Sequence, residues 1–99
     1  MVYILAVSTW PQEKSVQVGK AFLKMPKAPD YLNRLHVLLA GGGKGNKGYT
    51  LYEVPNEKLF DALQEISKRY IVFQEVEGFK VKVKPLMEVK DALAMIGLG

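Results

Sequence analysis

One histidine, one arginine and one tyrosine are the side chains of this sequence best suited to contact a small ligand. His36 is the only histidine, and imidazole is the side chain that most readily gains or loses a proton near neutral pH. Arg34 precedes it by two residues, so alternation along a strand places both side chains on one face. If Ala40 pairs with Gly48, His36 lies opposite Tyr52. These three side chains are our candidate ligand contacts; a histidine satisfied by a nearby hydroxyl or water is the simpler interpretation.

The segment between residues 41 and 48 is rich in glycine and lysine and spells GxGxxG from residue 43 to residue 48. A dinucleotide-binding fingerprint needs a helix directly after its glycines. The residues that follow here predict a strand, so we reject that interpretation. Backbone amides and lysine side chains of such a loop could still hold an anion or contact a partner. The residues of that candidate site are Gly43, Lys44, Gly45 and Lys47; a mobile hairpin tip is the simpler alternative.

The absence of cysteine removes several kinds of chemistry at once. Disulfides, thiolate nucleophiles, iron–sulfur clusters and cysteine zinc sites are excluded, and a single histidine excludes most histidine-based metal sites. We therefore expect no metal and no cofactor, and the sequence assigns no catalytic residue. The lack of cysteine also favours the cytoplasm, because small secreted domains usually depend on disulfides.

The composition predicts one globular α/β domain over residues 1–99. Hydrophobic residues make up 48% and charged residues 24%, which argues against disorder. The net charge of +4 is spread along the chain, so we expect no nucleic-acid partner. The apolar start of seven residues is too short to span a membrane and lacks the flanks of a signal peptide, so it predicts a strand.

The apolar pattern predicts the element order β, α, β, β, α, β. Runs without a helical period predict strands over residues 2–9, 34–40, 48–54 and 79–84, the first of them central in the sheet. Helical spacing predicts helices that begin at Pro11 and Pro55, because proline suits the first turn. An extra short strand over residues 70–75 and a last helix closed by Gly97 complete the prediction. Gly19 weakens the first helix by up to about 1 kcal/mol, and close packing at this position would be one reason for it.

Two helices on one face of a four-stranded antiparallel sheet leave the other face bare. Pairing Ala40 with Gly48 assigns to the helix side Leu35, Val37, Leu39, Tyr49 and Leu51. It assigns to the bare face Arg34, His36, Leu38, Ala40, Thr50, Tyr52 and Val54. We expect a second copy of the chain to cover this mixed face, with the last helix folding back as the alternative. Lys80, Lys82 and Lys84 alternate with apolar residues, as in an edge strand protected from aggregation.

Several short motifs resemble small proteins of the dimeric α/β-barrel superfamily, whose domains are ferredoxin-like. They are the run Val7-Ser8-Thr9-Trp10-Pro11, the glycines at 41–43, the run from Gly48 to Val54, and the strand that ends at Pro85. The superfamily includes antibiotic-biosynthesis monooxygenases, muconolactone isomerase and heme-degrading enzymes beside many members of unknown role. The resemblance implies the fold and a homodimer or larger homo-oligomer. No catalytic set and no heme-ligating histidine carries over to this chain.

Two kinds of function follow from these observations. In the first, a dimeric barrel binds a small apolar or aromatic ligand between its sheet and the partner, through His36, Tyr52 and Arg34. In the second, the chain is a non-enzymatic regulatory or assembly module. Its sheet face is then a subunit interface, and its glycine- and lysine-rich loop contacts an anion or a partner.

Overall fold

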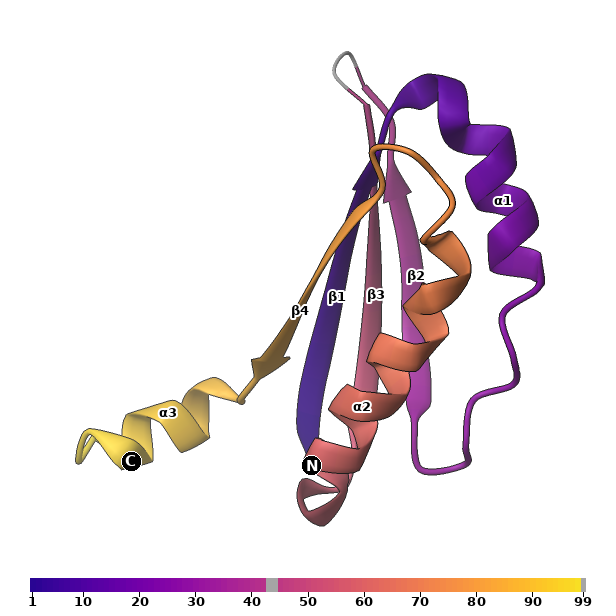
Figure 1. The fold of residues 1–99 in the computed structure, drawn as a ribbon. Coiled ribbons are helices and arrows are strands. Elements are labelled where there is room, and N and C mark those ends of the chain that lie inside the picture. The colour runs from indigo at the N-terminus through magenta and orange to yellow at the C-terminus, as the bar shows by residue number, and fades with distance from the viewer. Residues whose placement is uncertain (43–44, 99) are drawn as a thin grey trace.

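Four strands form one antiparallel sheet in a computed structural model, described for residues 1–42 and 45–98 (Figure 1). The strands are β1 (Val2–Trp10), β2 (Asn33–Ala40), β3 (Asn46–Val54) and β4 (Lys80–Leu86). The α-helices are α1 (Ser15–Leu23), α2 (Leu59–Arg69) and α3 (Val89–Met95). Single 3₁₀ turns are η1 (Gln12–Lys14), η2 (Asn56–Lys58) and η3 (Tyr70–Phe73). The sheet order β2-β3-β1-β4 confirms the predicted α+β class with an antiparallel sheet, and β1 is central.

The first two helical segments begin at prolines, as predicted. Pro11 and Pro55 have extended backbones, and each carbonyl accepts a hydrogen bond of 2.9 Å, from Lys14 N and Lys58 N respectively. A 3₁₀ turn opens each segment before the α-helix proper. The fixed φ of proline therefore sets the start of both helices.

Gly97 ends α3, as predicted. Its φ is +82°, its amide donates to the carbonyl of Ala94, and Leu98 N donates to Leu93 O at 2.8 Å. This is the Schellman arrangement, in which a left-handed glycine lets two free carbonyls of the last turn find donors.

The extra strand predicted over residues 70–75 is wrong. Tyr70–Phe73 continue α2 as a 3₁₀ turn, and further turns follow, with Val76 N donating to Phe73 O at 3.0 Å. Phe73 and Val76 are both buried. Their spacing of three residues is the period of a 3₁₀ helix, which brings both side chains to the same side of the chain. This apolar run therefore forms helical turns, because they let it pack against the sheet.

The core lies between the sheet and α1 and α2. Along β1 and β3 every second residue is buried, so one face of the sheet packs under the helices and the other does not. The larger buried cluster contains Ile4, Ala6, Leu32, Tyr52, Val54, Ala62 and Ile66. The smaller one contains Trp10, Val18, Phe73 and Val76.

Two elements of the described chain take little part in this core. All residues of β2 are exposed, and α3 contains no buried residue. In Figure 1, α3 projects away from the sheet at the end of β4. The radius of gyration of 15.1 Å therefore exceeds the value of about 13 Å for a compact domain of 100 residues.

Candidate functional site: the uncovered face of the sheet

The pairing of β2 with β3 differs by one residue from the predicted register. Ala40 pairs with Lys47, where we expected Gly48, because β3 begins at Asn46 and the connecting loop is correspondingly shorter. A slip of one residue exchanges the two faces of a strand relative to its neighbour. Tyr49 and Leu51 therefore lie on the uncovered face, and not under the helices as predicted.

The same slip places the predicted polar residues of β3 in the core. Thr50, Tyr52 and Val54 are all buried, and Tyr52 is only 1% exposed. Val37 and Leu39 pair with Thr50 and Gly48, and they share the helix-covered side as predicted.

An irregularity in β2 separates the other two candidate ligand contacts. The register shifts between Arg34 and His36, so that Arg34 pairs with Tyr52 whereas His36 pairs with Leu51. A bulge of this kind places one extra residue in one strand and reverses the facing of the side chains beyond it. Arg34 lies on the helix side, with its guanidinium carbon 5.7 Å from the centre of the Phe22 ring.

The structure therefore does not bring the three predicted contacts together. His36 lies on the uncovered face, Arg34 lies beside α1, and Tyr52 is buried in the main core. No ligand on either face could contact all three side chains.

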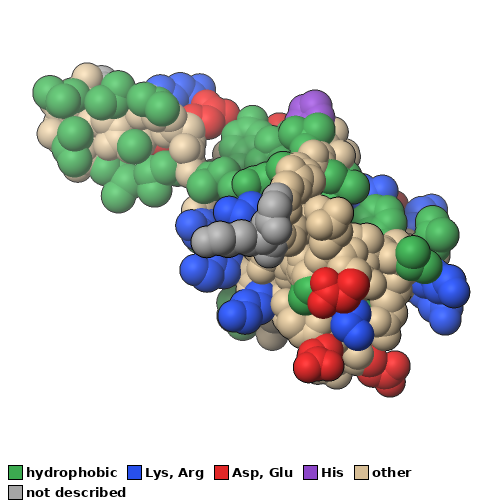
Figure 2. All heavy atoms as spheres, turned by 90° about the horizontal axis from the view of Figure 1, so that it is seen from above, with side chains coloured by type: hydrophobic (Ala, Val, Ile, Leu, Met, Phe, Trp, Pro, Cys, Tyr) green, Lys and Arg blue, Asp and Glu red, His purple; other side chains and the backbone are tan. Residues whose placement is uncertain are grey.

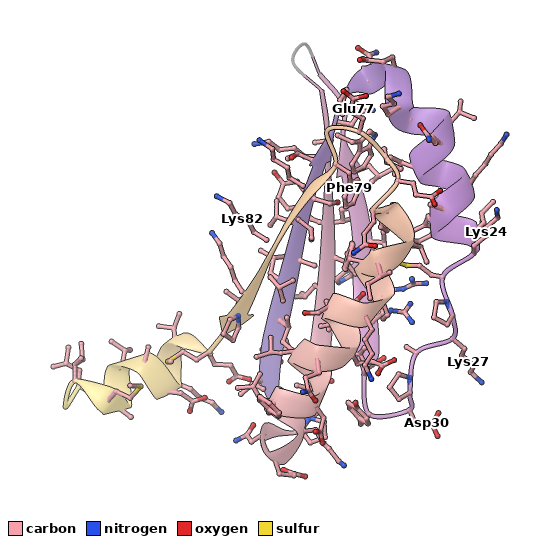
Figure 3. The ribbon with its side chains drawn as sticks, in the orientation of Figure 1. Lys24, Lys27, Asp30, Glu77, Phe79 and Lys82 are labelled. Atoms are coloured by element: carbon pink, nitrogen blue, oxygen red, sulfur yellow. The ribbon has the colours of Figure 1, made fainter. Side chains whose placement is uncertain are left out.

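The observed uncovered face has an apolar middle and a basic edge. Strand pairing assigns to it Tyr3, Leu5, Val7, Thr9, His36, Leu38, Ala40, Lys47, Tyr49, Leu51, Glu53, Lys80, Lys82, Lys84 and Leu86. Leu38 is 59% exposed there. The lysines of β4 lie along one edge, and Lys82 points outward from the sheet in Figure 3. Sequence reasoning missed the contribution of β1, because its apolar run predicts a strand that is covered on both faces.

The last helix adds a second apolar surface. Its side chains and those just after it are among the most exposed of the chain: Val89, Met95, Ile96 and Leu98 are 69–74% exposed. Figure 2 shows hydrophobic side chains gathered over this projecting helix and along the neighbouring side of the body. The exposed apolar face and the exposed apolar helix thus lie next to each other.

Tyr3 marks the end of the uncovered face nearest to α3. The neighbouring carboxylate of Glu53 is the main cause of a raised pKa of Tyr3, and desolvation and the negative charge of Glu88 add to it. Glu88 is the residue directly before α3. The tyrosine and the two carboxylates therefore form an acidic end of the face, opposite in charge to the lysines of β4.

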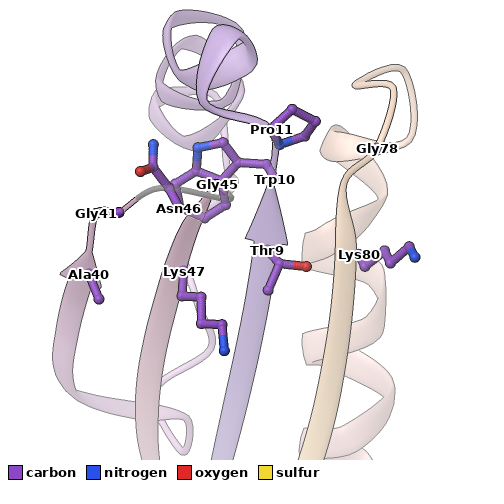
Figure 4. Close-up of a pocket in the computed structure, with 11 residues that line it drawn as sticks. Thr9, Trp10, Pro11, Ala40, Gly41, Gly45, Asn46, Lys47, Gly78 and Lys80 are labelled. Carbon is purple, nitrogen blue, oxygen red and sulfur yellow. The ribbon is translucent and has the colours of Figure 1, made fainter.

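The predicted anion loop is only partly within the described residues; Gly43 and Lys44 lie outside them. Gly45 and Lys47 line an open hollow of about 470 Å³ at the end of the strands, together with Thr9 and Lys80 (Figure 4). The ammonium groups of Lys47 and Lys80 do not converge on a common point in that view. Gly45 has a structural reason to be glycine: its φ is +136°, and a Cβ atom would lie 2.8 Å from the carbonyl oxygen of Trp10.

Within residues 1–42 and 45–98, no cluster of three acidic or histidine side chains could hold a metal ion. None of the helices in the same part of the chain has the length and apolar character needed to cross a membrane.

Comparison with known proteins gives a likeness in fold. No family model matches the sequence, and no curated protein matches it. Among solved structures, the de novo designed protein Foldit4 superimposes with a TM-score of 0.55 at 12% identity, over 88% of this chain and 96% of that chain. At this identity the likeness shows a shared arrangement of strands and helices and nothing about function.

Proposed function

We propose that this chain is a non-enzymatic assembly module: a ferredoxin-like domain whose uncovered sheet face binds the same face of a second copy, as in the dimeric α/β barrels. The observation that carries the proposal is a pair of adjacent apolar surfaces, the sheet face and α3, that no other part of the described chain covers. The alternative, a ligand held between the sheets by His36, Tyr52 and Arg34, loses support because only His36 is on this face.

The size of the surface suits a dimer. Four strands about 4.8 Å apart and about eight residues long give a face of about 500 Å², and one side of α3 adds about 100 Å². Because side chains protrude from the sheet, the solvent-accessible area is larger than this estimate for a flat surface. The total approaches the roughly 800 Å² that each partner contributes to a stable protein interface.

Charge restricts how the two copies meet. Lys80, Lys82 and Lys84 lie along the β4 edge of the face, and two such rows would repel one another if they were superimposed. The two sheets must therefore be offset so that the lysines lie at the rim, near water or near the acidic end formed by Glu53 and Glu88. The apolar middle of each sheet then meets its counterpart.

The chain's own last helix is a poor alternative cover. Folding back would bury the sheet face, but α3 projects away from it and starts at the edge strand. A helix of seven residues is about 10 Å long. It could cover only a fraction of the face, so a second copy accounts better for the whole of it.

The test compares two charge insertions at exposed leucines by sedimentation equilibrium. Leu38 is 59% exposed on the uncovered face and Leu23 is 83% exposed at the end of α1, so neither substitution disturbs the core. We expect the unaltered protein and Leu23→Glu to be dimers. Leu38→Glu should raise the dissociation constant by about 100-fold or more, because it buries a carboxylate in an apolar interface.

Two results would contradict the proposal. One is a monomeric unaltered protein at high micromolar concentration. The other is equal dissociation constants for the two variants, which would place the interface elsewhere. Binding of the unaltered protein to lipid vesicles in place of self-association would assign the apolar surface to a membrane.

A further inference from the structure

Close packing, one reason for a glycine within a helix, is not found at Gly19 of α1. A Cβ atom built on this glycine meets no atom within 4 Å. Val18 is the only buried residue of α1, whereas α2 buries three. Gly19 itself is exposed, so the space beside it is open to solvent, and few side chains of α1 fill the gap toward the sheet.

That space is a cavity of about 270 Å³ on the helix-covered side of the sheet. Gly19 and Phe22 line it from α1, and the exposed Val37 and Leu39 of β2 line it from the sheet edge. A cavity of about 150 Å³ holds a benzene ring in a protein core. This cavity therefore has room for a compound of about two fused rings, with an opening at the exposed edge strand.

The floor of the cavity depends on a second glycine. Gly48 of β3 pairs with Ser8 of β1 and Leu39 of β2, and a Cβ atom there would lie 2.8 Å from Ser8 Oγ and 3.3 Å from the Trp10 ring. The lack of a side chain at this position lets the Trp10 ring lie close to the strand, where it forms part of the cavity wall.

A stack of aromatic rings forms one wall. Phe73 and Phe79 are parallel within 8° with centroids 4.4 Å apart, and Trp10 stacks on Phe79 at 6.1 Å. Tyr70 lies 5.6 Å from Phe73. Figure 3 shows Phe79 on the side of the sheet that faces the helices. Flat rings favour offset stacking on such a wall.

Among the described residues, the polar groups that line the cavity are all uncharged, although Arg34 lies over the ring of Phe22. Ser8 and Thr50 are buried hydroxyl side chains in its floor, and Tyr70 adds a phenol. None of the residues that line the cavity is acidic or basic. A charged ligand would lose its hydration without gaining an opposite charge, whereas a neutral compound with one donor or acceptor could bond a hydroxyl.

The cavity is held open at one end by a hydrogen-bond network. Asn46 Nδ2 donates to Ser15 Oγ at 2.7 Å, Trp10 Nε1 donates to the same oxygen at 3.3 Å, and Ser15 Oγ donates to the carbonyl of Gln12 at 2.8 Å. These bonds tie the start of α1 to the ends of β1 and β3. They fix the position of the start of α1 relative to the strands at this end of the cavity, which is formed without a ligand.

We infer that the cavity between α1 and the sheet is a binding site for a small, uncharged, flat aromatic compound that carries one hydrogen-bonding group. It lies on the opposite side of the sheet from the dimer face. Its occupancy therefore does not depend on the proposed assembly, and either proposal can fail without the other.

The test uses indole as the probe and indole-3-carboxylate as its charged counterpart, with binding measured by two-dimensional amide NMR titration. We expect indole to bind with a dissociation constant of about 1 mM or tighter, which is usual for a fragment that buries two rings. Shifts should centre on Gly19, Gly48 and Thr50. The dissociation constant of the carboxylate should be at least about tenfold higher than that of indole.

Two variants at one position separate the cavity from the fold. Gly19→Leu places a side chain at the cavity wall and should weaken indole binding by about tenfold or more, while its melting temperature stays equal or rises because leucine is the better helix former. Gly19→Ala shares the helix effect and should keep the affinity within about threefold.

The proposal is overturned if indole causes no saturable shifts, or if the shifts lie on the uncovered face around His36 and Leu38. It is equally overturned if Gly19→Leu and Gly19→Ala bind indole as the unaltered protein does.

Discussion

Folding strongly changes the protonation of the Tyr70 phenol. Burial, only partly opposed by the neighbouring Thr50 hydroxyl, raises its pKa to about 12 from an ordinary value of 10.0. The folded state thus favours the protonated phenol. The resulting stability is fully present below pH 10 and is lost as the pH rises from about 10 to about 12.

We therefore predict that Tyr70→Phe changes how stability depends on alkaline pH. Between pH 9 and pH 12 the unaltered protein should lose about 2–3 kcal/mol more of its free energy of unfolding than Tyr70→Phe does. Urea denaturation at a series of pH values measures both. The comparison cancels the titration of lysines and other tyrosines, and parallel pH curves would show that the Tyr70 phenol is not held neutral by the fold.

At the scale of elements, the turn before β4 fixes how that strand joins the sheet. Gly78 has a φ of +83°, and a Cβ atom there would lie 2.7 Å from Cγ of Pro11. The turn is thereby packed against the residue that starts the first helical segment. A side chain at this position meets both the left-handed backbone and the proline ring.

Gly78→Ala should consequently destabilise the fold by about 2 kcal/mol, from left-handed backbone strain and the contact with Pro11. Gly42→Ala is the matched control, because a Cβ atom there meets no atom within 4 Å and the φ of Gly42 is not positive. Thermal unfolding of both variants measures the difference. Equal melting temperatures would mean that the turn adapts at no cost.

The elements themselves were largely predictable from the sequence, because each rests on local signals. Pro11 and Pro55 start helical segments and Gly97 ends one, and these residues act through their own backbone preferences. The strand predicted over residues 70–75 was wrong. The helical turns that this segment forms depend on burial of Phe73 and Val76 against residues distant in the sequence. Composition alone does not show that burial.

The candidate site was predictable only in outline. That one sheet face stays uncovered followed from the element order, but the residues on it depend on a register that a single loop residue decides. The start of β3 at Asn46 and the bulge after Arg34 moved Tyr52 and Arg34 to the other side. Neither feature has a strong local signal in the sequence.

At the scale of the whole molecule, one side of the sheet is covered by helices but contains a cavity, whereas the other side is uncovered. The helix-covered side is closed by α2 but leaves a cavity under α1, where Gly19 adds no side chain. The other side has no cover at all within the described residues, and α3 projects beside it with its apolar residues exposed. A second copy of the chain would complete the second side and leave the cavity accessible from the edge of β2.

The most direct test of the proposed assembly is an isotope-filtered NOE experiment on a mixture of ¹³C-labelled and unlabelled protein. It detects only methyl groups that touch the other copy. The dimer predicts intermolecular signals from Leu38, Leu51 and Val7, together with Ile96 at the end of α3. The absence of intermolecular signals, or signals confined to the outer side of α1 such as Val16 and Leu23, would contradict it.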